Sequence, residues 1–253
     1  MSNIYCQNCG RDTKNQTEVE AKDFIKIKNK AGLVTGNILV CGVCASCFQR
    51  RNEFLKKILD SEHKKRLIVA GPGTGKTYAF GQVLKKLPEG STAMVFTLIN
   101  SLVNELEKDL SIIEKRDISV NTLHGFCKRL LYSCVRQEDL EDGFVYLPQL
   151  PLLIEADARL LKFGFTQKSF RSTFSLINEG VELQFYMNRG AYYNAVSHDD
   201  SVYRVYDFYI KNKDKIPVYN AVIVDEYQDF NQLEAKFIDM LWPGPRISYT
   251  NLV

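Results

Sequence analysis

Apolar and polar residues alternate with two different periods along most of the chain. Apolar runs of four or five residues predict buried strands, and each is followed by a stretch with apolar positions at helical spacing. This strand–helix alternation indicates an α/β fold in which helices cover a parallel sheet. The predicted strands are Arg66–Ala70, Ala93–Thr97 and Ala221–Val224, and the predicted helices run from about Lys76 to Leu87, from Ser101 to Leu110 and from residue 232 to 242.

The alternation is interrupted between residues 135 and 216. This segment is rich in Phe, Tyr and Leu at helical spacing and has few strand signals, so it predicts a mostly helical inserted subdomain. The same spacing in residues 49–63 predicts a separate linker helix. The predicted organisation is a cysteine-bearing module at 1–48, the linker helix at 49–63, a sheet domain in two parts at 64–134 and 217–253, and the helical insertion at 135–216.

Composition and charge narrow the class of protein only slightly. Hydrophobic residues make up 45% and charged residues 25% of the chain, as in ordinary globular proteins. No apolar run approaches the roughly 18 residues of a membrane span, and the start, MSNIYCQNCG, lacks the features of a signal peptide. The cytoplasm is therefore the expected location. Residues 1–66 hold 13 Lys and Arg against 7 Asp and Glu, which suits either a phosphate backbone or a solvated surface.

Five of the seven cysteines lie within the first 47 residues. They form Cys6-x2-Cys9 and Cys41-x2-Cys44-x2-Cys47, and such steps in a reducing compartment indicate a metal site rather than disulfides. Four thiolates would make a closed structural Zn²⁺ site of the zinc-ribbon or treble-clef-like kind. The predicted ligands are Cys6, Cys9, Cys41 and Cys44, with Cys47 as the alternative in the second pair. The module would support its own folding, or it would also contact DNA.

A glycine-rich loop lies between the first predicted strand and the helix that follows. Its sequence, A-G-P-G-T-G-K-T, matches the phosphate-loop pattern G-x4-G-K-[ST] except at its first position. Glycines let backbone N–H groups approach a phosphate, and the following helix turns its positive end toward the same anion. Lys76 is predicted to reach the β- and γ-phosphates and Thr77 to bind Mg²⁺. The predicted nucleotide-binding residues are Ala70, Gly71, Pro72, Gly73, Thr74, Gly75, Lys76 and Thr77.

Two adjacent carboxylates end the strand Ala221–Val224. Asp225 suits a magnesium ligand, and Glu226 suits the base that orients and deprotonates an attacking water. A pair of surface acids is the simpler alternative, although the upstream phosphate loop argues against it. Lys76 and Asp225 are 149 positions apart, which leaves room for the whole insertion between them.

Together these motifs resemble the UvrD/Rep-type helicases of superfamily 1. A-G-P-G-T-G-K-T resembles their first motif, and V-D-E-Y-Q-D, in which Gln and Asp follow the acidic pair, resembles their second. The segment starting at Thr97 resembles motif Ia more loosely, and N-T-L-H-G-F, from residue 121, is similar to the motif just after it. The resemblance covers residues 64 to 242 and implies a RecA-like ATPase domain with a helical insertion.

The resemblance also implies roles for individual residues. Lys76 and Thr77 would hold phosphate and metal, Asp225 would be the metal ligand and Glu226 the catalytic base. Gln228 would sense the γ-phosphate. Thr97, Thr122, His124 and Phe126 would contact single-stranded DNA, although His124 and Phe126 also suit ordinary packing.

Two departures from the family limit these expectations. The glutamine that reads adenine in the family has no clear counterpart, since Gln49 is the only one in residues 49–63. The family's second RecA-like domain is not found after residue 242. We therefore expect a truncated ATP-dependent DNA helicase or translocase. The alternative is a catalytically incomplete nucleotide- and DNA-binding module, completed by a second chain.

Overall fold

The computed structural model describes most of the chain in two compact units. The described residues are 5–6, 9–11, 15–20, 28–29, 32–33, 37–63, 65–70, 75–98, 100–110, 116–133, 140–241 and 246–250. The first unit contains residues 1–63 and 70–86, and the second contains residues 64–69 and 87–252. In the described residues, no helix combines the length and the apolar character needed to cross a bilayer.

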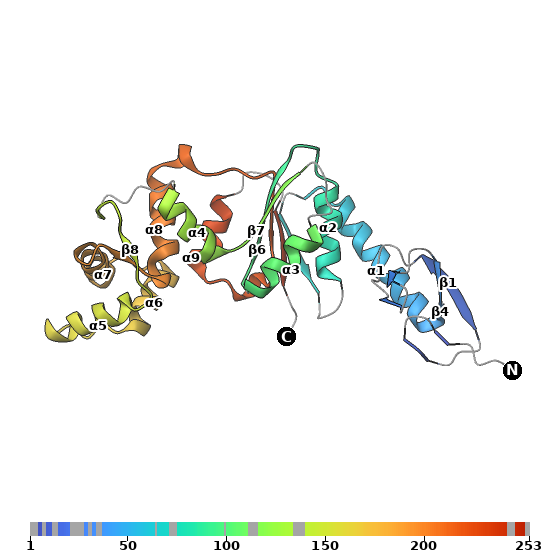
Figure 1. The fold of residues 1–253 in the computed structure, drawn as a ribbon, viewed down its shortest axis with the longest axis horizontal. Helices are drawn as coiled ribbons and strands as arrows, with labels where there is room; N and C mark the ends of the chain where they lie inside the picture. The colour runs from blue at the N-terminus through green and yellow to red at the C-terminus, as the bar shows by residue number, and fades with distance from the viewer. Residues whose placement is uncertain are drawn as a thin grey trace. The chain divides into compact units, whose positions relative to one another are not determined.

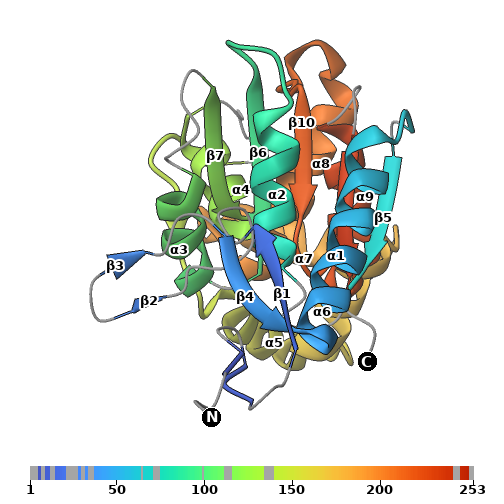
Figure 2. The ribbon, with the colours of Figure 1, turned by 90° about the vertical axis from the view of Figure 1, so that its right-hand side faces the viewer.

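The first unit joins a small antiparallel sheet to two helices. Strand β1 (Gln16–Glu20) pairs with β4 (Asn37–Cys41), and the short strands β2 (Lys28–Asn29) and β3 (Gly32–Leu33) pair with each other. Helix α1 (Gly42–Asp60) follows β4 directly and contacts α2 (Lys76–Lys85). Figure 2 shows α1 beginning at the end of β4.

Helix α1 begins earlier than the sequence predicted. The expected start was residue 49, but α1 begins at Gly42, with Cys41 as its extended N-cap residue, and ends at Asp60. Cys44 and Phe48, one helical turn apart, are both buried. The predicted module boundary at residue 48 therefore falls inside a continuous helix, which physically joins the cysteines to the rest of the unit.

The second unit contains a five-stranded parallel sheet in the order β5-β11-β10-β6-β7. The strands are β5 (Lys65–Val69), β6 (Thr92–Thr97), β7 (Asp117–Thr122), β10 (Ala221–Val224) and β11 (Arg246–Thr250). The mixed α/β class with a parallel sheet, as predicted, is confirmed. Strands β7 and β11 were not predicted, and β11 lies between β5 and β10.

Both faces of the central strands are buried. Met94, Phe96, Val222 and Val224 join one core cluster, while Val95 and Ile223, which point to the opposite face, are also fully buried. Helix α3 (Asn100–Leu110) packs against β6 and β7. Helices α4 (Leu123–Ser133) and α9 (Gln232–Met240) contribute to the same core cluster as Phe96 and Val224.

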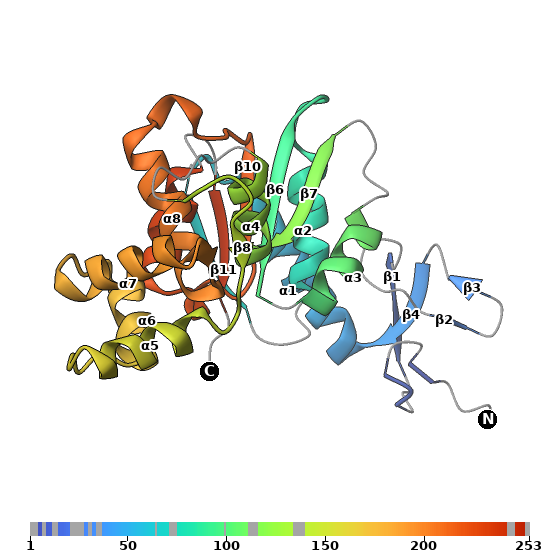
Figure 3. The ribbon, with the colours of Figure 1, turned by 60° about the vertical axis from the view of Figure 1, so that its left-hand side comes forward.

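The insertion is mostly helical, as predicted, and shares that core with the sheet. Helix α8 packs against both α4 and α9, and α6 packs against α9. Figure 3 shows α4, α6 and α8 gathered on one side of the sheet, and Figure 1 shows α4 and α9 between the sheet and α5 to α7. Its elements are β8 (Val145–Tyr146), α5 (Leu150–Leu160), α6 (Gln167–Leu176), α7 (Val181–Tyr192), β9 (Ala195–Val196), α8 (His198–Lys211) and the 3₁₀ turn η1 (Lys213–Lys215).

Candidate functional site

The carboxyl ends of the parallel strands meet at one edge of the sheet. Val69 ends β5, Val224 ends β10 and Thr97 ends β6, and the strand registers place all three ends at this edge. Only β11 lies between β5 and β10, so their backbones are about 10 Å apart at the usual strand spacing. The glycine loop after Val69 therefore leaves the sheet at the edge where Asp225 and Glu226 follow Val224.

The last residues of the predicted phosphate loop start helix α2. Gly75 is the N-cap residue, with φ of +88°, a left-handed conformation that glycine adopts without a steric penalty. Lys76 and Thr77 lie in the first helical turn, and the N–H groups at a helix N-terminus favour an anion. Ala70 is described, whereas Gly71, Pro72, Gly73 and Thr74 lie outside the described residues.

The two acids differ in exposure and in backbone conformation. Asp225 is 8% exposed, and its backbone N–H donates to the carbonyl of Phe96 at 2.8 Å, so it continues the sheet register. Glu226 is only partly buried and has φ of +53°, a left-handed conformation that costs a residue with a Cβ roughly 1–2 kcal/mol. Such strain persists where the surrounding structure imposes it, and it is concentrated at functional sites.

Gln228 lies in the short 3₁₀ turn η2 (Tyr227–Asp229) after the acidic pair. Its side-chain amide donates to Glu226 Oε2 at 2.9 Å and to Asp229 Oδ2 at 3.3 Å. The residue predicted to sense the γ-phosphate is therefore bonded to the predicted base. Lys76 and Thr77 belong to the first unit and the acids to the second, so their convergence on one nucleotide stays a prediction.

The four residues predicted to contact DNA are largely used inside the protein. Thr97 is 1% exposed, and its Oγ1 has no hydrogen-bond partner among the described residues. Phe126 is 5% exposed and packs edge-on against Phe96, with ring centroids 5.5 Å apart. Thr122 Oγ1 accepts a hydrogen bond from the N–H of Gly125 at 3.2 Å. Packing is thus the role that the structure gives to Phe126, one of the two roles that the sequence left open.

His124 belongs to a cluster that joins three helices. Its ring stacks on that of His198, with centroids 3.7 Å apart, and its Nε2 lies 3.7 Å from Glu234 Oε1. Burial, together with His198, lowers the pKa of His124 to about 4. Burial also raises the pKa of Glu234, which already accepts a hydrogen bond from the Asn231 N–H. The His124 imidazole is therefore neutral near pH 7, so its contact with Glu234 is not an ion pair at that pH.

A buried charge pair in α8 was missed by the sequence analysis. Arg204 Nε donates to Asp200 Oδ2 at 2.6 Å, and both side chains are fully buried. Asp200 Oδ1 also accepts from the Ser197 N–H and hydroxyl, and Ser197 Oγ lies 2.9 Å from the Tyr186 hydroxyl. The S-x-x-D step before an apolar helix, followed by Arg four positions after the Asp, is the signal that indicates this network.

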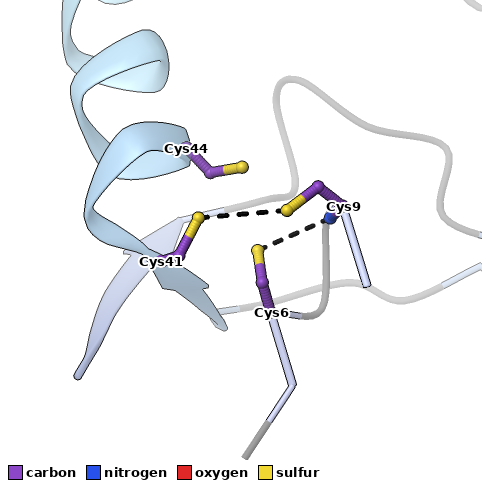
Figure 4. Close-up of side chains that lie close together, drawn as sticks. All are labelled: Cys6, Cys9, Cys41 and Cys44. Atoms are coloured by element: carbon purple, nitrogen blue, oxygen red, sulfur yellow. Dashed lines mark hydrogen bonds between the residues drawn. The ribbon is translucent and has the colours of Figure 1, made fainter. Parts of the chain in front are cut away.

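The N-terminal cysteines form a tight cluster in the first unit. Cys6, Cys9, Cys41 and Cys44 place their four sulfurs within 4.8 Å of one another. Figure 4 shows the four side chains near one another: Cys6 and Cys9 come from the N-terminal segment, Cys41 from the end of β4 and Cys44 from the first turn of α1. Cys47 is exposed, and among the described residues it does not belong to this cluster. The structure therefore favours Cys41 and Cys44 as the second pair.

The geometry of this cluster fits a tetrahedral metal ion. Zn–S bonds of about 2.3 Å imply sulfurs roughly 3.8 Å apart in a tetrahedral site. The Cys9 and Cys41 sulfurs are 3.9 Å apart, and the Cys9 N–H donates to Cys6 Sγ at 3.5 Å. Three of the four thiols are buried, which suits a closed structural site. The four cysteines can thus hold Zn²⁺ as thiolates.

Replacing Cys41 with serine is expected to lower the zinc content from about one ion per chain to nearly none, because a tetrahedral site loses one of its four ligands. Metal analysis of the purified protein after dialysis measures this. Cys47→Ser is the matched control, since Cys47 is exposed and lies outside the cluster. Equal zinc content in the two variants would contradict the assignment of Cys41.

Comparison with known proteins identifies the larger part of the chain. A protein-family model described as "AAA domain" matches residues 56–248, about three quarters of the sequence. The matched range includes the glycine loop, the sheet, the helical insertion and the acidic pair. It begins within α1 and leaves out the cysteine cluster. The search of curated proteins found no match.

Proposed function

Because the chain belongs to the AAA domain family, whose members are P-loop NTPases of the helicase type, we propose that it is a UvrD-like ATP-dependent DNA helicase or translocase. It binds ATP with Mg²⁺ and binds single-stranded DNA. The cysteine module holds a structural zinc ion. A reducing location such as the cytoplasm keeps its thiols free for the metal.

One observation carries the nucleotide part of the proposal. The strand that leads into the glycine loop and the strand that ends in Asp225 and Glu226 finish at the same sheet edge, with only β11 between them. In open parallel sheets, ligands bind outside the carboxyl ends of the strands. The strained backbone of Glu226 at this edge supports the same assignment.

Each residue of the site has a definite chemical task in this proposal. Lys76 and the N–H groups of the first turn of α2 bind the phosphates, and Thr77 and Asp225 hold the metal. Bound Mg²⁺ supplies charge neutralisation at the phosphate oxygens. Glu226 accepts the proton of the attacking water, and Gln228, bonded to Glu226 Oε2, holds that carboxylate in position.

Replacing Lys76 with alanine is expected to weaken ATP binding at least about 10-fold, because a charge-assisted contact to phosphate is lost. Titration calorimetry with Mg-ATP measures the dissociation constant. Lys85→Ala is the control, because Lys85 lies in the last turn of the same helix, away from its N-terminus. Unchanged affinity in the Lys76 variant would defeat the nucleotide proposal.

The second candidate is a module that binds nucleotide and DNA without turnover. The burial of Thr97 and Phe126 counts against a DNA contact by these two side chains in either candidate. A second RecA-like domain from outside residues 1–253 is then the expected partner. Hydrolysis of ATP by the chain alone, stimulated by single-stranded DNA, decides against this candidate.

A further inference from the structure

We propose that Arg51, which lies on α1 outside the recognised motifs, is an additional phosphate-binding residue of the nucleotide site. This inference rests on the proposed function, since it names a further residue for the same site. Arg51 reaches the glycine loop from the helix that begins at the cysteine cluster. The ligand class is the polyphosphate of a nucleoside di- or triphosphate.

The Arg51 guanidinium lies beside Gly75. Arg51 Nη2 lies 2.5 Å from the position that a Cβ on Gly75 would occupy, and Arg51 Cζ lies 3.5 Å from it. Gly75 is the left-handed residue that caps α2, immediately before Lys76. A Cβ at this position would displace the guanidinium, so the Arg51 guanidinium lies directly at the helix end that is predicted to receive phosphate.

Positive charge accumulates at this helix end. Lys76 is the first residue of α2, the helix N-terminus carries a partial positive charge, and Arg51 adds a guanidinium beside Gly75. The first turn of α2 contains no acidic residue. A polyphosphate can contact all three positive groups at once, and the planar guanidinium can donate two parallel hydrogen bonds to phosphate oxygens.

Contacts near both ends of α1 hold the helix that carries Arg51. The helix begins at Gly42, directly after Cys41 of the cysteine cluster, and Arg51 follows Cys44 by two helical turns, about 10 Å along the axis. Near the other end, Lys86 Nζ donates to the Leu59 carbonyl at 3.1 Å and lies 3.2 Å from Asp60 Oδ1. These contacts place the Arg51 backbone before a ligand binds, which reduces the entropy lost when its side chain binds an anion.

The experiment compares Arg51→Gln with Arg50→Gln in the full zinc-loaded chain. Both variants remove one positive charge from α1, but Arg50 is exposed whereas Arg51 is half-buried beside Gly75. The probes are ATP, ADP, inorganic tripolyphosphate and adenosine, each competing with a fluorescent ATP analogue.

Arg51→Gln is expected to bind ATP, ADP and tripolyphosphate roughly 10- to 100-fold more weakly, the range for one hydrogen bond between charged groups. Adenosine binding is expected to stay the same, and Arg50→Gln to stay within about twofold of the original chain for every probe.

Two results would overturn the assignment of Arg51. The first is equal affinity for tripolyphosphate in the two variants. The second is an equal loss for adenosine and ATP in Arg51→Gln, which would show that Arg51 only supports the loop. If Arg51→Gln lowers the melting temperature, Arg51→Lys is used as a second variant. Arg51→Lys keeps the positive charge, so it is expected to bind tripolyphosphate more tightly than Arg51→Gln. Equal affinity of Arg51→Lys and Arg51→Gln for tripolyphosphate counts against the proposal. Failure of the Lys76→Ala test refutes the nucleotide site itself, whereas these results concern Arg51 alone.

Discussion

Glu226→Gln is expected to lower the rate of ATP hydrolysis by about 10²- to 10⁴-fold, the usual contribution of a general base. The amide has the shape of the carboxylate but cannot accept a proton from water, so the affinity for Mg-ATP should be retained. Phosphate release, measured with and without oligo(dT), gives the rate and its stimulation by DNA. Absence of stimulation in the original chain would count against the DNA part of the proposal.

Asp229→Asn is the matched control for this change. Asp229 lies in the same 3₁₀ turn, is exposed, and accepts from the same Gln228 amide at 3.3 Å. It is expected to hydrolyse ATP at nearly the original rate because it does not face the attacking water in the proposed mechanism. If Glu226→Gln hydrolyses ATP as fast as Asp229→Asn, Glu226 is not the base.

Asp200→Asn is expected to lower the free energy of unfolding by about 3–5 kcal/mol, because it leaves the buried Arg204 charge without compensation. Denaturation with urea, followed by circular dichroism, measures the change. The mutation also weakens the N-terminal cap of α8, where Asp200 accepts from the Ser197 N–H at 2.7 Å. Both effects destabilise the insertion and the core that it shares with the sheet.

The control for this prediction lies on the same helix with the same spacing. Asp207 and Lys211 form an i,i+4 ion pair with side-chain exposures of 36% and 62%, so Asp207→Asn should cost less than about 1 kcal/mol. Adding Arg204→Met to Asp200→Asn should recover part of the loss, since the uncompensated charge is removed. A double variant that loses the sum of the two single effects would contradict a coupled pair.

Local sequence patterns predicted much of the sheet but not all of its strands. The apolar run Ala221–Val224 and the strand leading to the glycine loop were predicted because buried parallel strands are continuously apolar. Strands β7, D-I-S-V-N-T, and β11, R-I-S-Y-T, mix polar and apolar residues, and their place in the sheet depends on pairing with distant strands. The start of α1 was missed because its first turn carries the spaced cysteines, which had been assigned to the preceding module.

The site was predictable only where a motif specifies local geometry. The left-handed Gly75 at the start of α2 follows from the glycine loop, and the acidic pair follows from the end of an apolar strand. The stacking of His124 on His198 depends on an insertion that packs against α4, and no short motif predicts that contact. The approach of Arg51 to Gly75 likewise joins residues that are distant in sequence.

The place of β11 in the sheet affects how the protein folds during translation. In the described sheet, β5 pairs with β11 alone, and the partners Lys65 and Arg246 are 181 positions apart. At a synthesis rate of roughly 5–20 residues per second, β5 waits on the order of 10–40 seconds before its partner is made. Among the strands of the described parallel sheet, β5 is therefore the first to be synthesised, and its partner β11 is the last. Nascent chains shorter than 246 residues would contain β10 and the acidic pair while β5, which leads into the glycine loop, still lacks its partner strand.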